Sequence, residues 1–172
     1  MARPINTLLG IVLGALAFFC AQYMVRRKRL TIAVPDMPVV TIEDIGDVFE
    51  ALSSQGKEGS FAVFLCGENA EPPAARDALN VQFSIAEGAL GIDWVLLAPV
   101  NRETQARFSD FFEAKGYEVS EKSQNDVDFL RVEGDHLAEL LQEFLASQFG
   151  VTPTQPLDLI ADGFDWSDSD DE

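Results

Sequence analysis

The side chains able to do acid–base or nucleophilic chemistry are few in this chain. His136 is its one histidine, and it follows Asp135 at the start of a predicted helix. A general base of this kind needs a nucleophile within hydrogen-bond reach, and no Ser or Cys stands in a recognisable nucleophile motif. We therefore interpret His136 as a solvated residue at a helix start, and we predict no catalytic residue and no enzyme activity.

Clustered acids are the remaining candidates for binding a hard cation. Asp126 and Asp128 form one such group, and Glu43, Asp44 and Asp47 form another. Neither group has the spacing of an EF-hand loop, and acids on a helix face are usually only solvated. The chain also lacks a P-loop and a GxGxxG motif. We predict neither a metal site nor a cofactor.

Cysteine chemistry is equally limited. Cys20 belongs to an apolar N-terminal stretch and Cys66 to a predicted buried strand, so the two are not expected to pair. There is no disulfide framework, no CxxC pair and no zinc-ligand spacing, which fits a reducing cytoplasm.

Aromatic residues are the more promising candidates for binding, because the chain has 13 Phe. Phe83 and Trp94 would form an apolar groove for a peptide or a second subunit if they lie on a sheet face that helices leave partly uncovered. The alternative is that both rings belong to the core. Phe164 and Trp166 stand in an acidic tail, where they either fold back on the domain or anchor a partner.

The stretch that must position these candidates is residues 5–25, an apolar run without a charge that is followed by Arg26, Arg27, Lys28 and Arg29. About 20 such residues suffice for a transmembrane helix. Because basic residues near a span stay on the cytoplasmic side, we expect a single-pass inner-membrane protein with its N-terminus outside and its C-terminal domain in the cytoplasm.

Two alternatives for this stretch are a cleaved signal peptide and a lipoprotein signal. Both fit less well, because the charge follows the apolar run and Phe18-Phe19 precedes Cys20 where small residues are needed. Four small residues fall on one face of the predicted span and would allow close helix pairing, hence a homodimer. They are Gly10, Gly14, Ala17 and Ala21.

Charge is distributed very unevenly along the chain. The whole sequence has a formal net charge of −17, and the part after Arg29 has seven basic and 29 acidic residues. Such a charge opposes binding to nucleic acid or to anionic lipid surfaces, and it favours solubility and basic partners.

Hydrophobic periodicity predicts the remaining elements. Helices are expected to begin at Thr41, Asn101 and Asp135, where capping residues precede apolar positions at helical spacing. Strands are expected at 60–67, 79–87, 92–97, 117–121 and 127–132, the second and third forming a hairpin.

These elements predict an α+β fold. It consists of an N-terminal transmembrane helix and one α-β-β-β-α-β-β-α domain with a mainly antiparallel sheet. The expected organisation is an anchor with a basic flank at 1–29, a linker at 30–40, the domain at 41–159 and an acidic disordered tail at 160–172.

The element order and several segments resemble the YbjN and type III secretion chaperone-like group of small α+β domains. The similar segments are NVQFS at 80–84, DWVLL at 93–97, FFEAKGY at 111–117 and LLQEFLASQFGV at 140–151, within residues 41–159. The resemblance implies non-enzymatic binding of a protein or peptide, often as a dimer.

We therefore expect a membrane-anchored, chaperone-like or adaptor-like binding module facing the cytoplasm. The alternative is an acidic immunity-type inhibitor that neutralises a basic toxin, since charge complementarity would favour that pair.

Overall fold

The structure of this chain is a computed structural model that describes residues 38–66 and 78–166. The apolar segment 5–25, which was predicted to be a transmembrane helix, lies outside the described residues. The same holds for its small residues Gly10, Gly14, Ala17 and Ala21. Of the helices that are described, none combines the length and the apolar character needed to cross a bilayer.

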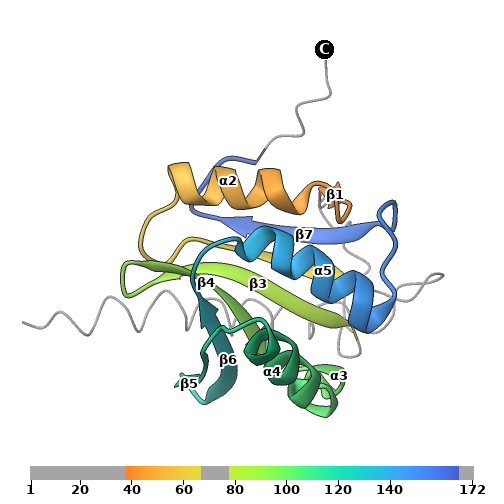
Figure 1. Cartoon of the computed structure of the whole chain (residues 1–172). Helices are drawn as coiled ribbons and strands as arrows, with labels where there is room; N and C mark the ends of the chain where they lie inside the picture. The colour runs from red at the N-terminus through yellow and green to blue at the C-terminus, as the bar shows by residue number, and fades with distance from the viewer. Residues whose placement is uncertain (1–37, 67–77, 167–172) are drawn as a thin grey trace, which may run out of the picture.

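A seven-stranded sheet forms the centre of the described domain, and every neighbouring pair of strands is antiparallel (Figure 1). The spatial order is β1-β7-β2-β3-β4-β6-β5. In chain order the strands are β1 Val39–Val40, β2 Phe61–Cys66, β3 Leu79–Ala86, β4 Ala89–Val95, β5 Val119–Gln124, β6 Val127–Glu133 and β7 Leu157–Asp162.

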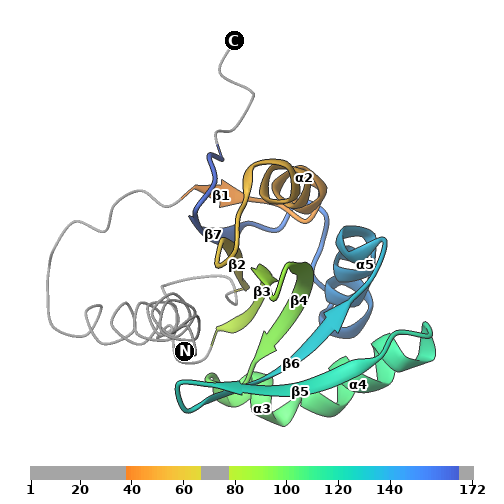
Figure 2. The ribbon, with the colours of Figure 1, turned by 90° about the vertical axis from the view of Figure 1, so that its left-hand side faces the viewer.

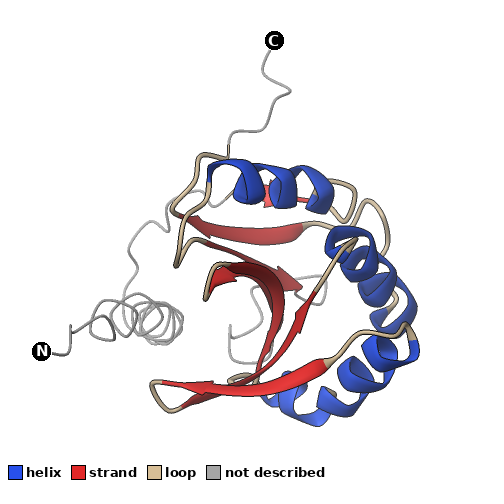
Figure 3. Cartoon of the chain, turned by 60° about the vertical axis from the view of Figure 1, so that its left-hand side comes forward, coloured by secondary structure: helices blue, strands red, loops and turns tan. Residues whose placement is uncertain are grey.

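The described helices are α2 Ile45–Gln55, α3 Pro99–Glu103, α4 Gln105–Ala114 and α5 Leu137–Phe149. Helices α2, α4 and α5 all lie on the same side of the sheet, which curves away from them (Figures 2 and 3). We call this side the helix-covered face and the opposite side the helix-free face, because no described helix packs on it.

The main core lies between the helices and the helix-covered face. Helix α5 buries Leu141 and Phe144 there, and α4 buries Phe108 and Phe112, because apolar residues recur at helical spacing in both. Trp94 of β4 stacks on Phe108 with ring centroids 5.4 Å apart. Aromatic packing of this kind joins the helices to the sheet.

The predicted element order is wrong. The sheet contains two strands that were not expected, β1 and β7, and the predicted second helix is two helices, α3 and α4, separated at Thr104. At that break the backbone leaves helical geometry, and the Thr104 hydroxyl donates a hydrogen bond to the carbonyl of Val100. The corrected order is β-α-β-β-β-α-α-β-β-α-β, with a fully antiparallel sheet.

Strand β7 was missed because its sequence carries a weak local signal. It follows two prolines, includes Asp158 and Asp162, and leads into the acidic end of the chain, all of which favour an irregular tail. Its strand conformation comes from pairing with β2 along Phe61–Leu65 and with β1. β7 therefore crosses the expected boundary between domain and tail at residue 160.

Candidate functional site

The helix-free face carries an apolar patch although no described helix packs on it. Because side chains alternate along a strand, β2 directs Phe61, Val63 and Leu65 to this face and Phe64 to the opposite one. The three side chains are 8%, 3% and 9% exposed, and Ile160 of β7 packs against them. We call these four residues the apolar patch.

A buried polar cluster lies beside the apolar patch on the same face. β3 contributes Gln82 and Ser84, β4 contributes Asp93, and β6 contributes Arg131. The register places them next to one another, since Gln82 is opposite Asp93 and Asp93 is opposite Arg131. The cluster is therefore assembled from three strands that are adjacent in the sheet.

The centre of the cluster is an ion pair between Arg131 and Asp93. Arg131 Nη1 lies 2.6 Å from Asp93 Oδ1, and the two side chains are 4% and 1% exposed. Arg131 Nε also donates to Glu133 Oε1 at 2.6 Å. A buried pair of this kind depends on having its remaining polar atoms satisfied.

The remaining polar atoms of the pair have partners. Ser84 Oγ and Gln82 Nε2 donate to Asp93 Oδ2, at 2.5 and 2.9 Å. Arg131 Nη1 reaches Ser84 Oγ at 2.9 Å, and Nη2 reaches the carbonyl oxygen of Ala89 at 2.9 Å. With its donors occupied in this way, the guanidinium does not offer an anion-binding site.

The lack of a side chain at Gly91 leaves the space that the Arg131 guanidinium occupies. A Cβ at this position of β4 would come within 2.7 Å of Arg131 Cζ and 2.9 Å of the Val132 carbonyl oxygen. Only a residue without a side chain lets Arg131 lie this close to β4. The third strand was expected to begin at residue 92, whereas β4 begins at Ala89, and the turn before it is formed by Glu87 and Gly88, both with positive φ.

The electrostatics of the pair follow from its burial. Burial raises the pKa of Asp93 above its ordinary value of 3.8, and Arg131, Ser84 and Gln82 oppose that rise. Burial lowers the pKa of Arg131, but Asp93 and Glu133 outweigh this effect and raise it. With three donors on the two Asp93 oxygens, the geometry is that of an ionised carboxylate facing a guanidinium.

Among the described residues of this face, Asn80 has a buried side-chain donor without a hydrogen-bond partner. Its side chain is 7% exposed, and its Nδ2 has no hydrogen-bond partner. Its backbone is satisfied differently, because Asn101 Nδ2 donates to the Asn80 carbonyl and Asn101 Oδ1 accepts from the Asn80 amide. A buried amide donor without a partner is costly, and in the sheet register Asn80 lies opposite Leu65 of the apolar patch.

The structure places Phe83 and Trp94, two of the residues predicted to bind a partner, on the helix-covered face. Both are 0% exposed and belong to the main core. Phe83 contacts Phe49 and Phe64 edge-on, and Trp94 Nε1 donates to the Asn101 carbonyl at 3.0 Å. These placements correspond to the core alternative, and they leave neither ring on the surface.

The other two predicted binding residues, Phe164 and Trp166, follow β7. Both are half-buried and pack against the main core. Trp166 Nε1 is buried and has no hydrogen-bond partner. The folded-back arrangement is therefore the one observed, and it does not bring these rings together with the helix-free face.

A groove lies between helices α2 and α5, away from the helix-free face. It is an open groove of about 550 Å³ with Phe49 and Ala138 among its apolar residues and Glu50 and Glu139 among its acids. His136 lies at one end of it, exposed, with φ 57° at the residue before α5. Its Nδ1 is 3.9 Å from Glu139 Oε1.

Metal-binding chemistry finds no support in the part of the chain that is described. No group of three or more His, Cys, Asp or Glu side chains converges there. Asp44, one of the acids considered from the sequence, instead accepts hydrogen bonds from the Thr41 amide and hydroxyl just before α2.

Sequence reasoning did not find the polar cluster or the apolar patch. A signal for the patch was present, because FAVFLC in β2 is apolar at every position and so has two buried faces. The polar residues of β3 alternate with apolar ones, which by itself indicates only that one face of the strand is polar. Their partner Arg131 lies 38 residues beyond Asp93, a separation that only the sheet register closes.

No model of a known protein family matches this chain, and comparison with curated proteins and with solved structures gives no match either.

Proposed function

We propose that this chain is a membrane-tethered, non-enzymatic protein that binds a partner polypeptide on the helix-free face of its sheet. The bound segment is apolar and runs over the apolar patch, with a backbone carbonyl near Asn80. The domain faces the cytoplasm and holds its partner close to the membrane.

The observation that carries this proposal is the chemistry of the helix-free face. An antiparallel sheet with one solvated face normally alternates apolar and polar residues along each strand. β2 instead presents Phe61, Val63 and Leu65 to the side that no described helix covers. An apolar patch beside an unsatisfied amide donor has the composition of a peptide-binding surface.

The tether rests on the sequence. Residues 5–25 are apolar and uncharged, and the four basic residues that follow them favour retention of the domain on the cytoplasmic side. The resemblance to the YbjN and type III secretion chaperone-like group adds an expectation of peptide binding and of a homodimer, both of which stay predictions.

Photo-crosslinking followed by direct binding tests the proposal. The full chain carries a diazirine-bearing aliphatic residue at position 160 and is irradiated in its native membranes. We expect crosslinks to one defined segment of a partner protein. A synthetic peptide of that segment should then bind the purified full chain, and Ile160→Glu should weaken binding by about tenfold or more, the loss of one buried aliphatic contact.

Ala146→Glu is the matched control, because it adds the same charge at an exposed position of α5. It should leave the affinity of the peptide unchanged. Equal losses for Ile160→Glu and Ala146→Glu, or no peptide binding at all, would refute the helix-free face as the binding site. A catalytic turnover lost on substituting a few acids would refute the non-enzymatic assignment.

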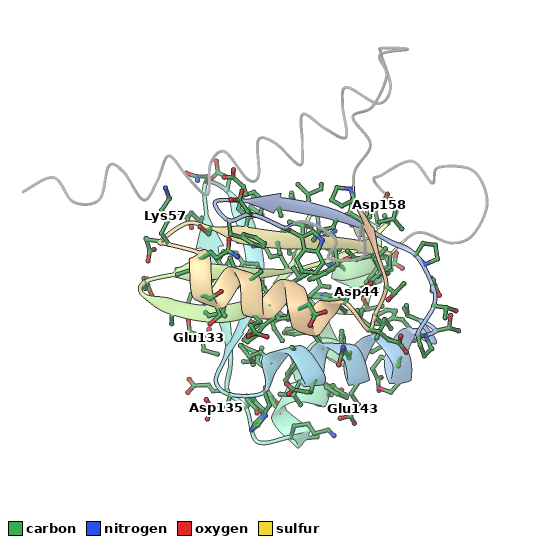
Figure 4. All side chains as sticks on the ribbon, turned by 90° about the horizontal axis from the view of Figure 1, so that it is seen from above. Asp44, Lys57, Glu133, Asp135, Glu143 and Asp158 are labelled. Carbon is green, nitrogen blue, oxygen red and sulfur yellow. The ribbon has the colours of Figure 1, made fainter. Side chains whose placement is uncertain are left out.

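A basic partner, as in an immunity-type inhibitor, is favoured by a different observation. Acidic side chains project from separate elements, among them Asp44, Asp135 and Glu143 near the helices and Asp158 on β7 (Figure 4). Glu50 and Glu139 also line the groove between α2 and α5. One-to-one binding that weakens steeply with salt, and that Glu50→Gln with Glu139→Gln reduces, would select this function.

A further inference from the structure

Helices α2 and α5 lie side by side, with the open groove between them (Figures 1 and 2). The α2 wall of the groove consists of residues that recur every three or four positions, from Gly46 to Ser54, and so share one side of that helix. At about 1.5 Å per residue, this wall is about 12 Å long. The groove is a different site from the helix-free face, because neither the apolar patch nor the polar cluster lines it.

Short side chains keep the groove open. A Cβ built on Gly46 would meet no described atom within 4 Å beyond its own helix turn, so the space beside this residue is open. Ala138 of α5 also lines the groove, and half-buried Phe49 gives it an aromatic wall. Gln142 Nε2 donates to the Ile42 carbonyl at 2.7 Å and joins α5 to the residues before α2. The groove is therefore formed in the free domain, which lowers the entropic cost of binding.

Two carboxylates on opposite walls determine the charge of the groove. Glu50 belongs to α2 and Glu139 to α5, and both are exposed. Within the described residues, no Lys or Arg lines the groove, and Glu50 takes part in no ion pair. Glu139 lies 3.9 Å from His136, measured from Oε1 to Nδ1. The negative charge on the two walls therefore attracts a cation from outside the domain.

We propose that the groove between α2 and α5 binds a cationic amphipathic helix of a partner protein. Lys or Arg side chains of that helix pair with Glu50 and Glu139, and its apolar side chains pack against Phe49 and Ala138. The inference deepens the basic-partner candidate of the proposed function, on which it rests, by naming the site and the secondary structure of the partner. It does not depend on peptide binding at the helix-free face.

The shape of the groove favours a helix over an extended peptide as the ligand. Both walls are helices, whose backbone hydrogen bonds are made within each helix, so they offer no strand edge to an extended segment. The α2 wall has the length of about two helical turns, and the side-chain ridges of a third helix fit a groove between two others. Charge complementarity then selects a cationic helix, since an acidic one would be repelled.

A synthetic helix tests the site. The probe is an alanine-based peptide of about 15 residues, with two Arg four positions apart and a Leu on the same side, held helical by a side-chain staple. Its affinity for the full chain in micelles of an uncharged detergent is measured by fluorescence anisotropy, with micelles alone as the blank. We expect saturable binding that weakens as salt is raised, and no binding of the same peptide with Glu in place of Arg.

Two variants separate the effect of charge from that of shape. Glu50→Gln combined with Glu139→Gln should weaken binding of the cationic peptide by about tenfold, because two ion pairs are lost. Gly46→Leu should weaken it by about tenfold or more, because the new side chain occupies the open space that the bound helix needs.

Glu118→Gln combined with Glu121→Gln is the control for charge, and Ala146→Leu is the control for size, since these positions are exposed and lie outside the groove. Both controls should leave the affinity unchanged. Equal losses for the two pairs of glutamates would keep the basic-partner candidate and refute the groove as its site. Unchanged binding to Gly46→Leu, or no binding of the cationic peptide, also overturns the inference. Ile160→Glu should not affect this peptide, so the result is independent of the helix-free face.

Discussion

The two faces of strand β3 differ in how they are stabilised. On the helix-covered face, Val81 and Phe83 pack into an aromatic core in which hydrophobic burial dominates. On the helix-free face, Gln82 and Ser84 are just as buried but donate to Asp93. The comparison shows that the apolar content of the chain builds the helix-covered core, whereas specific hydrogen bonds and one ion pair organise the opposite side.

The two faces should differ most in the free energy of unfolding that is lost when an aromatic side chain is replaced by Ala. Phe83→Ala should lower the free energy of unfolding by about 3–5 kcal/mol, because it leaves a cavity in a closed core. Phe61→Ala on the helix-free face should cost less, about 1–2 kcal/mol, because no described helix packs over Phe61. Urea denaturation of the full chain in detergent micelles, followed by circular dichroism, measures both. Equal losses would contradict a difference in packing between the two faces.

The next effect concerns the buried ion pair. Arg131→Met should destabilise the domain by about 3 kcal/mol, since it leaves Asp93 buried without its cation. Lys115→Met is the matched control, because its pair with Glu143 is 40% and 51% exposed and should contribute less than about 1 kcal/mol.

Replacing both members of the buried pair sharpens the interpretation. Arg131→Met combined with Asp93→Leu should recover most of the stability lost in Arg131→Met, because no buried charge remains. A double variant that is as unstable as the single one would show that the pair contributes through more than charge compensation.

A pH dependence distinguishes the ionisable groups of the two faces. Burial raises the pKa of the Cys66 thiol from 9.0 to about 12. Between pH 9 and pH 12 the folded state therefore keeps the thiol proton while the unfolded state loses it. The contribution of Cys66 to the free energy of unfolding is fully present below pH 9 and declines as the pH rises toward 12. The expected slope is about 1.4 kcal/mol per pH unit.

Cys66→Ala removes that contribution and should flatten the alkaline decline, as measured by urea denaturation between pH 8.5 and 10.5. Other alkaline titrations remain in both proteins, so the difference between them isolates the thiol. Parallel curves for the two proteins would contradict burial of a neutral Cys66 on the helix-covered side.

The smallest effect is expected at Asn80. Asn80→Leu removes an unsatisfied buried donor, so the free energy of unfolding should stay constant or rise by about 1 kcal/mol. Gln82→Leu is the matched comparison on the same strand face, and it should destabilise because it removes a donor to Asp93. The idea of a vacant donor fails if both variants are destabilised equally in thermal unfolding.

Much of the helical layer could be predicted from the sequence. The helix beginning at Leu137 and the Phe108 and Phe112 positions follow from apolar residues at helical spacing, and the β3–β4 pairing follows from two alternating strands around a short turn. Helix ends were less accurate. Asp135 was expected to cap α5, whereas His136 occupies that position with a left-handed backbone.

The site residues were predicted less well, because the presence of aromatic residues in a strand does not tell on which face of the sheet their side chains lie. Phe83 and Trp94 carry the strongest apolar signal in their strands and for that reason lie in the core. Asn80, Asp93 and Arg131 looked like ordinary strand polar residues. Their role depends on cross-strand neighbours, which local sequence does not specify.

The sequence by itself determined the acidity of the chain, the uncharged apolar segment 5–25, and the helices and strands whose periodicity is local. Only the tertiary structure decided that Leu157–Asp162 is a strand beside β2, and that Asp93 and Arg131 meet in a buried pair. The reason is physical. Periodicity arises from one segment's own geometry, whereas strand pairing and charge burial arise from contacts between segments that are distant along the chain.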